Sequence, residues 1–205
     1  MQYDVMDYFD QIEDFFDESQ HSELYDIFEA LQFKIKKNNY HFKNIQNIIG
    51  QADLLEKEDY YNEIHLPIYF EVESFLVSLR TNVDILLHLL NFAFDMNIDK
   101  NNVTLYTIFH HKQLPKNVKN IFERYTRPYN NPTWTFIYTS RNEIVHEKSV
   151  NQILPIDIDL FGYEKPMVFF EWENAPREII VFFQQCLRFL ENFVSQLLQS
   201  VKISL

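Results

Sequence analysis

Most of the chain carries apolar residues at intervals of three and four, which places them on one face of an α-helix. Ser22 and Thr104 have the chemistry of helix N-caps, and Pro67 and Pro115 that of first-turn residues. Gly50 is a typical helix end. We predict helices over residues 4–17, 22–35, 42–50, 67–96, 104–109, 115–124, 133–148 and 174–199.

The pattern changes between residues 156 and 172. Residues 156–160 alternate apolar and acidic side chains, and residues 167–172 are β-branched and aromatic. Residues 161–166 between them contain Gly and Pro, which are typical of turns. The sequence therefore predicts an all-α, up-and-down helical bundle with a short β-hairpin inserted before the last helix. We expect one domain over residues 1–205.

Composition supports a globular protein. The chain has 205 residues, of which 46% are hydrophobic and 17% aromatic, enough for a substantial core. Two glycines exclude a glycine-rich phosphate loop, and the single Cys186, in an apolar run, is expected to be a buried thiol. The sequence contains no signal-peptide core and no uninterrupted apolar span of about 18 residues. We expect a cytoplasmic protein that does not bind a membrane.

Charge is distributed unevenly along the chain. The formal net charge is −12, and residues 1–30 hold ten carboxylates without a Lys or Arg. Residues 110–128 hold five cations against Glu123 alone. This segment could form a basic entrance for RNA on an acidic protein, or simply a solvated helix face. The candidate RNA-binding residues are Lys112, Lys116, Lys119, Arg124 and Arg127.

The residues with the strongest chemical potential follow this basic segment. Arg141 can hold a phosphate and keeps its charge, and His146 can exchange a proton near neutral pH. Asn142 adds a side-chain amide between them. Together, a group that holds phosphate and a group that exchanges protons could cleave a phosphodiester without a metal or a cofactor. The adjacent His110 and His111 would diverge by about 100° on a helix, so we assign them no metal.

Helical spacing limits what these residues can do together. Arg141 and His146 would lie about 140° apart on a regular helix, so one helix cannot easily aim both at one phosphate. Either the helix unwinds near Glu147, or a second subunit supplies its own copies. Asn142 is four residues before His146 and could hold the imidazole tautomer. Glu143 could meet Arg141 or Lys148.

The segment Arg141-Asn142-Glu143-Ile144-Val145-His146 resembles the Arg-x4-to-6-His motif of the HEPN superfamily, the higher eukaryotes and prokaryotes nucleotide-binding domains. The resemblance implies a helical core over residues 65–200, with residues 1–60 as an added N-terminal helical element. It also implies a homodimer in which two motifs face each other. Many family members are metal-independent endoribonucleases in phage defence or toxin–antitoxin pairs, so an antitoxin or other regulatory protein is a further expected partner.

One departure from the family concerns regulation. A subset of these proteins carries Tyr two residues after the His, where a partner nucleotidyltransferase modifies it. Lys148 occupies that position here, so this mode of neutralisation is not expected.

The resemblance implies a reaction on RNA. His146 would act as general base on the 2′-hydroxyl or as general acid on the departing 5′-oxygen, and Arg141 would stabilise the charge that builds on the phosphate. Asn142 would orient His146 or bind the phosphate. The product would be a 2′,3′-cyclic phosphate. Two alternatives remain: a non-catalytic HEPN-like module that binds RNA, nucleotide or protein, and a structural helical protein in which the pattern is coincidental.

Residues near the motif have two interpretations each. Trp134, Tyr138 and Tyr129 could stack RNA bases, although aromatic residues at this spacing more often belong to a core. Arg80 and Asp84 are four residues apart and could form an ion pair on a helix surface or lie beneath the motif.

Overall fold

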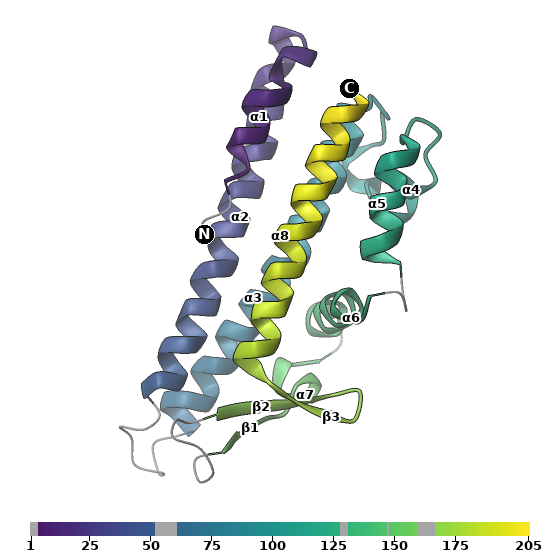
Figure 1. The fold of residues 1–205 in the computed structure, drawn as a ribbon. Helices are drawn as coiled ribbons and strands as arrows, with labels where there is room; N and C mark the ends of the chain where they lie inside the picture. The colour runs from purple at the N-terminus through teal and green to yellow at the C-terminus, as the bar shows by residue number, and fades with distance from the viewer. Residues whose placement is uncertain (1–3, 52–60, 128–130, 147, 160–166) are drawn as a thin grey trace. The chain divides into compact units, whose positions relative to one another are not determined.

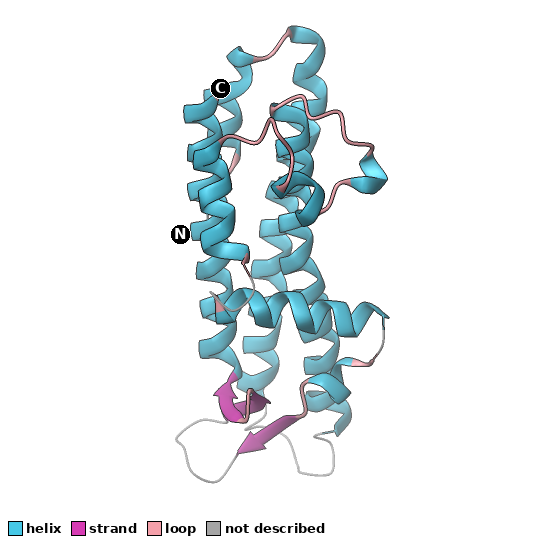
Figure 2. Cartoon of the chain, turned by 90° about the vertical axis from the view of Figure 1, so that its right-hand side faces the viewer, coloured by secondary structure: helices cyan, strands magenta, loops and turns pink. Residues whose placement is uncertain are grey.

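The computed structural model describes residues 4–51, 61–127, 131–146, 148–159 and 167–205 (Figure 1). It is mostly helical, with one small antiparallel sheet of three strands in the order β1-β2-β3, drawn in magenta in Figure 2. The expected helical class is therefore confirmed. The helices are α1 Met6–Ile12, α2 Glu18–Gln51, α3 Leu66–Ala93, α4 Leu105–Phe109, α5 Lys116–Thr126, α6 Pro132–His146, α7 Val150–Ile153 and α8 Ile179–Ser204. The strands are β1 Ile156–Asp159, β2 Met167–Trp172 and β3 Ala175–Glu178.

Helix α2 is one continuous element where the sequence predicted two. The two predicted helices left residues 36–41 outside, but α2 continues through them. Asn38 is buried there, at the position where an apolar residue would continue the stripe. The buried stripe alternates steps of four and three, the spacing of a heptad repeat. Its members are Leu24, Phe28, Leu31, Ile35, Asn38, Phe42, Ile45 and Ile49.

The predicted hairpin is extended by a third strand. We expected Asn174 to cap the last helix, and this was wrong. Glu173 and Asn174 have φ angles of 53° and 57°, and they form the two-residue turn between β2 and β3, where Trp172 pairs with Ala175. Helix α8 begins later, and the Glu178 carboxylate caps it by accepting hydrogen bonds from the next backbone N–H groups at 3.0 and 2.6 Å.

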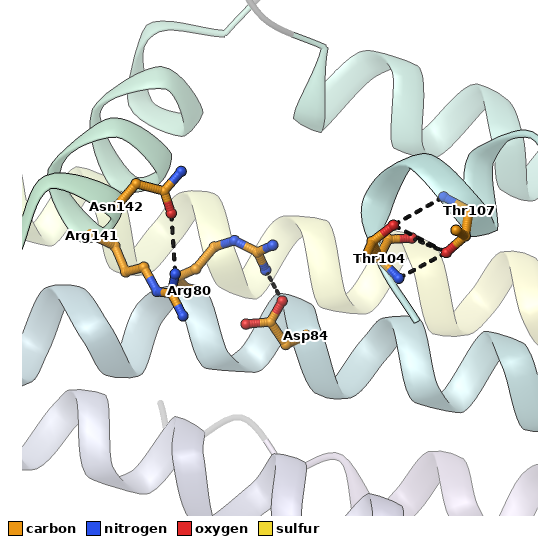
Figure 3. Close-up of polar contacts among 6 residues, drawn as sticks. All are labelled: Arg80, Asp84, Thr104, Thr107, Arg141 and Asn142. Carbon is orange, nitrogen blue, oxygen red and sulfur yellow. Dashed lines mark hydrogen bonds and ion pairs between the residues drawn. The ribbon is translucent and has the colours of Figure 1, made fainter. Parts of the chain in front are cut away.

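Several predicted boundaries are confirmed. Thr104 caps α4 with a reciprocal capping box to Thr107 (Figure 3), and Pro115 precedes α5.

Helix α1 is shorter than expected, because residues Glu13–Phe15 form a 3₁₀ turn. The chain enters α3 through a π-helical turn, Tyr61–His65, rather than starting at Pro67. Helix α7 was not predicted, because four residues are too few for a periodic signal.

The chain divides into two compact units that share the long helices α2, α3 and α8. Unit 1 comprises residues 1–36, 79–135 and 189–205, and unit 2 comprises residues 37–78 and 136–188. Each unit has an aromatic core of its own.

In unit 1, α5 packs on the C-terminal half of α8. The rings of Phe122 and Phe193 meet edge to face with centroids 5.4 Å apart, and Tyr125 stacks on Phe193 at 5.1 Å. At the amino-terminal end, Phe9 of α1 contacts Phe28 of α2 at 5.9 Å. These contacts orient α5 so that its opposite side faces solvent.

In unit 2, α6 is anchored by aromatic contacts to the sheet and to α8. The ring of Phe136 lies 4.9 Å from that of Trp172 on β2 and 4.7 Å from that of Phe182 on α8, measured between centroids. Phe75 of α3 stacks on Phe183 of α8 at 4.8 Å. The motif helix therefore rests on a packed surface that fixes which of its sides is exposed.

Among the described residues, the stretch Asn62–Ala93 is the one helix long and apolar enough to cross a membrane. Most of that window is buried inside the protein, as expected for the central helix of a packed core.

Candidate functional site

Helix α6 carries the three motif residues, and local hydrogen bonds close it at both ends. Asn131 Oδ1 accepts a hydrogen bond from the backbone N–H of Trp134 at 3.2 Å. At the other end, the backbone N–H of Lys148 donates to the carbonyl oxygen of Glu143 at 2.8 Å, in a six-residue closing turn. The helix remains regular up to His146.

The sequence allowed two ways to bring Arg141 and His146 to one phosphate: unwinding of the helix near Glu147, or a second subunit that supplies its own copies. Arg141 and His146 both lie inside α6, so their separation of about 140° around the helix axis holds. Glu147, where unwinding was considered, lies outside the described residues. One chain therefore presents the guanidinium and the imidazole on two flanks of α6.

Arg141 and Asn142 contact each other. Arg141 is half-buried, and its Nη1 donates a hydrogen bond to Asn142 Oδ1 at 3.1 Å (Figure 3). The sequence suggested that Asn142 orients His146 or binds the phosphate; the hydrogen bond that the structure gives its amide oxygen is the one from Arg141. The Asn142 side chain therefore orients the cation of the motif in this structure.

His146 is exposed at the last position of α6. In the part of the chain that the structure describes, its ring makes no hydrogen bond or ion pair. Glu143 pairs with Lys148 at 3.6 Å between Oε2 and Nζ, one of the two pairings that the sequence allowed. The imidazole is thus open to a substrate or to a second protein molecule.

An exposed strip lies between the two flanks of α6. Tyr138, Asn142 and Val145 fall within the arc that separates Arg141 from His146, as a rotation of 100° per residue requires. The side chain of Tyr138 is 42% exposed and that of Val145 is 47% exposed. An exposed Tyr and Val one heptad apart form an apolar strip that could pack against another helix.

The opposite side of α6 belongs to the core. Phe136, Ile137 and Ser140 on that side are buried. Trp134 lies one heptad before Arg141, on the Arg141 flank of the helix, and is only 2% exposed. Base stacking on Trp134 is therefore excluded, whereas Tyr138 remains accessible. Tyr129 lies outside the described residues.

The five candidate RNA-binding cations gather on α5 and beside it, in unit 1. Lys112 precedes the helix and Arg127 ends it, and both are exposed. Lys119 Nζ lies 4.4 Å from the centroid of the Phe109 ring, and Arg124 Nη1 donates to Gln196 Oε1 at 3.2 Å. Lys116 is exposed in the first turn of α5. Lys119 thus lies toward α4 and Arg124 toward α8, and the five cations belong to unit 1 while the three motif residues belong to unit 2.

Arg80 and Asp84 form the ion pair that their spacing allowed (Figure 3). The pair is not a simple surface contact, because Arg80 is buried and its guanidinium carbon lies 5.5 Å from the centroid of the Trp134 ring. It joins α3 to the first turn of α6 and has a structural role there.

One polar cluster was missed by sequence reasoning. His41 Nδ1 lies 2.5 Å from Glu71 Oε2, and Asn44 Nδ2 donates to Glu71 Oε1 at 3.0 Å. His41 is buried. The cluster ties α2 to α3 in unit 2. An unbroken helix over residues 18–51 would have placed His41 beside the buried stripe, but the predicted break at residues 36–41 concealed that position.

No group of three or more His, Cys, Asp or Glu side chains that could hold a metal ion occurs within the described ranges.

Comparisons of the chain with protein-family models, with curated proteins and with solved structures found no match.

Proposed function

We propose that the protein is a metal-independent endoribonuclease of the HEPN type, whose active site forms between the α6 helices of two copies. The observation that carries the proposal is that α6 stays helical through His146, with the exposed strip lying between Arg141 and His146. A two-fold axis that runs parallel to α6 beside the strip would bring the Arg141 flank of each copy toward the His146 flank of the other, because a rotation of 180° about that axis exchanges the two flanks.

The proposed reaction assigns a separate task to each side chain. His146 removes the proton from an RNA 2′-hydroxyl, and the resulting oxygen attacks the adjacent phosphorus atom and displaces the 5′-oxygen. Arg141 stabilises the additional negative charge on the phosphate oxygens in the transition state. Asn142 holds the guanidinium in position through its hydrogen bond. The departing oxygen takes a proton from an imidazolium or from water, and the product carries a 2′,3′-cyclic phosphate.

The cations of α5 are proposed to bind the RNA backbone. Lys112, Lys116 and Arg127 are exposed, and each contact with a phosphate would release counterions and make binding weaken with salt. Residues 110–128 thus give a chain of net charge −12 a local surplus of four positive charges that RNA could contact.

The second candidate function is a HEPN-like module that binds RNA, nucleotide or a protein without cleaving. Two observations favour it: the acidic net charge, and the Asn142 amide oxygen that faces Arg141 instead of His146. A role in phage defence or beside an antitoxin stays a prediction based on the family resemblance.

The decisive experiment is subunit complementation. End-labelled RNA of mixed sequence is incubated in excess EDTA with the wild type, Arg141→Ala, His146→Ala, and a mixture of the two variants that has been unfolded and refolded together. We expect each variant alone to be inactive. In the mixture, half of the dimers are mixed and each contains one intact composite site, so about a quarter of the wild-type activity should return.

Two controls separate loss of the site from loss of fold. Arg188→Ala removes an exposed arginine elsewhere in unit 2, and His65→Ala removes another histidine there; both should cleave like the wild type. Cleavage by the single variants would disprove the role of the motif. Inactive variants without recovery in the mixture would place Arg141 and His146 in one chain, and a folded but inactive wild type would favour the binding module.

A further inference from the structure

A pocket of about 250 Å³ lies between α4 and α5, in unit 1. Helix α4 and its C-cap contribute Tyr106, Phe109 and His110, and α5 contributes Glu123 and Arg127 at its C-terminal end. Figure 1 shows the two helices side by side. The lining combines aromatic rings with one carboxylate and one guanidinium, a composition typical of sites for small polar ligands with an aromatic ring.

The aromatic wall is held in place by local contacts. The rings of Tyr106 and His110 have centroids 4.2 Å apart and an interplanar angle of 37°. His110 Nδ1 lies 2.9 Å from the carbonyl oxygen of Tyr106; because a carbonyl only accepts, Nδ1 carries the proton. Tyr106 is nonetheless 72% exposed. A fixed aromatic face that stays open to solvent is suited to stacking with a planar ligand.

The charges around the pocket favour an anionic ligand. Within the described ranges, neither Glu123 nor Arg127 forms an ion pair. Lys119 also lies beside the pocket, with Nζ 4.4 Å from the Phe109 ring centroid. A cation stacked on the rings would be attracted to Glu123 but repelled by Lys119 and Arg127. A ligand with an aromatic ring and a negative group could stack on the rings and would be attracted to Lys119 and Arg127.

We propose that the α4–α5 pocket binds a nucleotide, with the base stacked on Tyr106 and the phosphate on Arg127. Glu123 accepts a hydrogen bond from an amino group of the base or from a ribose hydroxyl. The inference goes beyond the proposed cleavage, because the pocket residues lie outside the α6 motif. A free nucleotide and one unit of an RNA strand share this recognition chemistry, and the experiment distinguishes them.

Calorimetric titration tests the proposal with AMP and with a short 2′-O-methyl oligoribonucleotide, which cannot be cleaved by 2′-hydroxyl attack. We expect saturable binding of at least one of them. Tyr106→Ala and Arg127→Ala should each weaken binding about tenfold or more, since each removes one of the two main contacts. Adenosine and ribose 5-phosphate should bind less well than AMP, because each lacks one half of the ligand.

Matched variants control for general effects. Arg188→Ala removes an exposed arginine outside the pocket and outside the basic segment, and Tyr40→Ala removes another exposed tyrosine outside the pocket. Both should bind like the wild type. Equal weakening by Arg188→Ala and Arg127→Ala would overturn the proposal in favour of diffuse electrostatic attraction. Absence of binding to both ligands, or binding that Tyr106→Ala leaves unchanged, would overturn it as well.

The two ligands distinguish the source of the nucleotide. Binding of AMP without the oligonucleotide indicates a free nucleotide, and tighter binding of the oligonucleotide with the same sensitivity to Tyr106→Ala indicates a strand. Repeating the titration with His146→Ala separates this inference from the cleavage proposal: nucleotide binding should persist when the α6 site is inactive, and its loss in Tyr106→Ala should not depend on α6.

Discussion

The α4–α5 pocket and the exposed strip of α6 are opposite kinds of candidate site. The pocket is concave, and one chain supplies its aromatic wall, carboxylate and guanidinium. The strip is the convex side of a helix, and one chain holds its cation and imidazole on separate flanks. A concave site can work alone, whereas a convex one needs a second surface. Protein concentration should therefore affect the two functions differently: RNA cleavage should depend on dimer formation, and nucleotide binding should not.

The largest expected effect separates the two sites by mutation. His146→Ala should lower the rate of RNA cleavage by about 10²- to 10⁴-fold, the range typical of losing a general acid or base, and leave the affinity for AMP unchanged. Tyr106→Ala should weaken AMP binding and leave the chemical step intact at saturating RNA. Single-turnover cleavage and calorimetry on both variants provide the comparison. If either variant impaired both functions equally, the sites could not be independent.

Disrupting the strip should affect cleavage through oligomeric state. Val145→Asp places two carboxylates near the proposed two-fold axis, and we expect dimer dissociation to increase by about tenfold to a hundredfold. Sedimentation at several concentrations, with cleavage assays at the same concentrations, measures this effect. Val181→Asp is the matched control, because Val181 is similarly exposed on α8. The same oligomeric state in both variants would contradict a dimer through α6.

A smaller effect concerns the stability of the unit that carries α6. Asn38 is buried in the apolar stripe of α2, and its amide atoms have no hydrogen-bond partner among the described residues. Asn38→Leu should raise the free energy of unfolding by about 1–3 kcal/mol, because it removes an unsatisfied buried polar group. Urea denaturation measures the change, and Asn39→Leu on the exposed side should give no such gain. A destabilised Asn38→Leu protein would mean that the amide has a partner essential to the fold.

The smallest effect is a pH dependence in the same unit. Burial raises the pKa of the Cys186 thiol well above its ordinary value. A group whose pKa is higher in the folded state stabilises the fold below its unfolded pKa and loses that contribution as pH rises above about 8.5. At pH 9.5, one unit above that unfolded pKa, the loss should be about 1.4 kcal/mol for the wild type and absent for Cys186→Ala. Ellman's reagent should react with Cys186 only after unfolding, and rapid reaction with the native protein would contradict a buried thiol.

Sequence reasoning worked where the signal was local. Thr104 and Pro115 marked helix starts through their own backbone chemistry, and the apolar spacing placed α6 almost to the residue. The buried Cys186 followed from its apolar neighbours. In each case the residues that define the feature are adjacent in the chain, so no tertiary contact was needed to find it.

The predictions from the sequence were wrong where burial in the tertiary structure overrode the local preference of the residues. Residues 36–41 were left out of the predicted helices, because nothing in the sequence shows that Asn38 is buried within a helix. Strand β3 contains Ala, Pro, Arg and Glu, none of them β-formers, and becomes a strand by pairing with β2. The pair His41–Glu71 joins helices 30 residues apart in the chain. The pocket at Tyr106 likewise depends on how α5 packs against α4.

Helix α6 is regular through His146 and is closed by the hydrogen bond from Lys148 to Glu143. The number of residues between Arg141 and His146 therefore sets mainly the direction in which the imidazole points, and much less its distance from the guanidinium. Each residue added between Arg141 and His146 would turn the imidazole by about 100° while advancing it only about 1.5 Å along the axis. A single inserted residue would turn the imidazole from the flank beside the exposed strip toward the side of α6 that packs on the sheet. A lengthened motif could function only with a differently docked partner, so the permitted gap and the geometry of the dimer should change together.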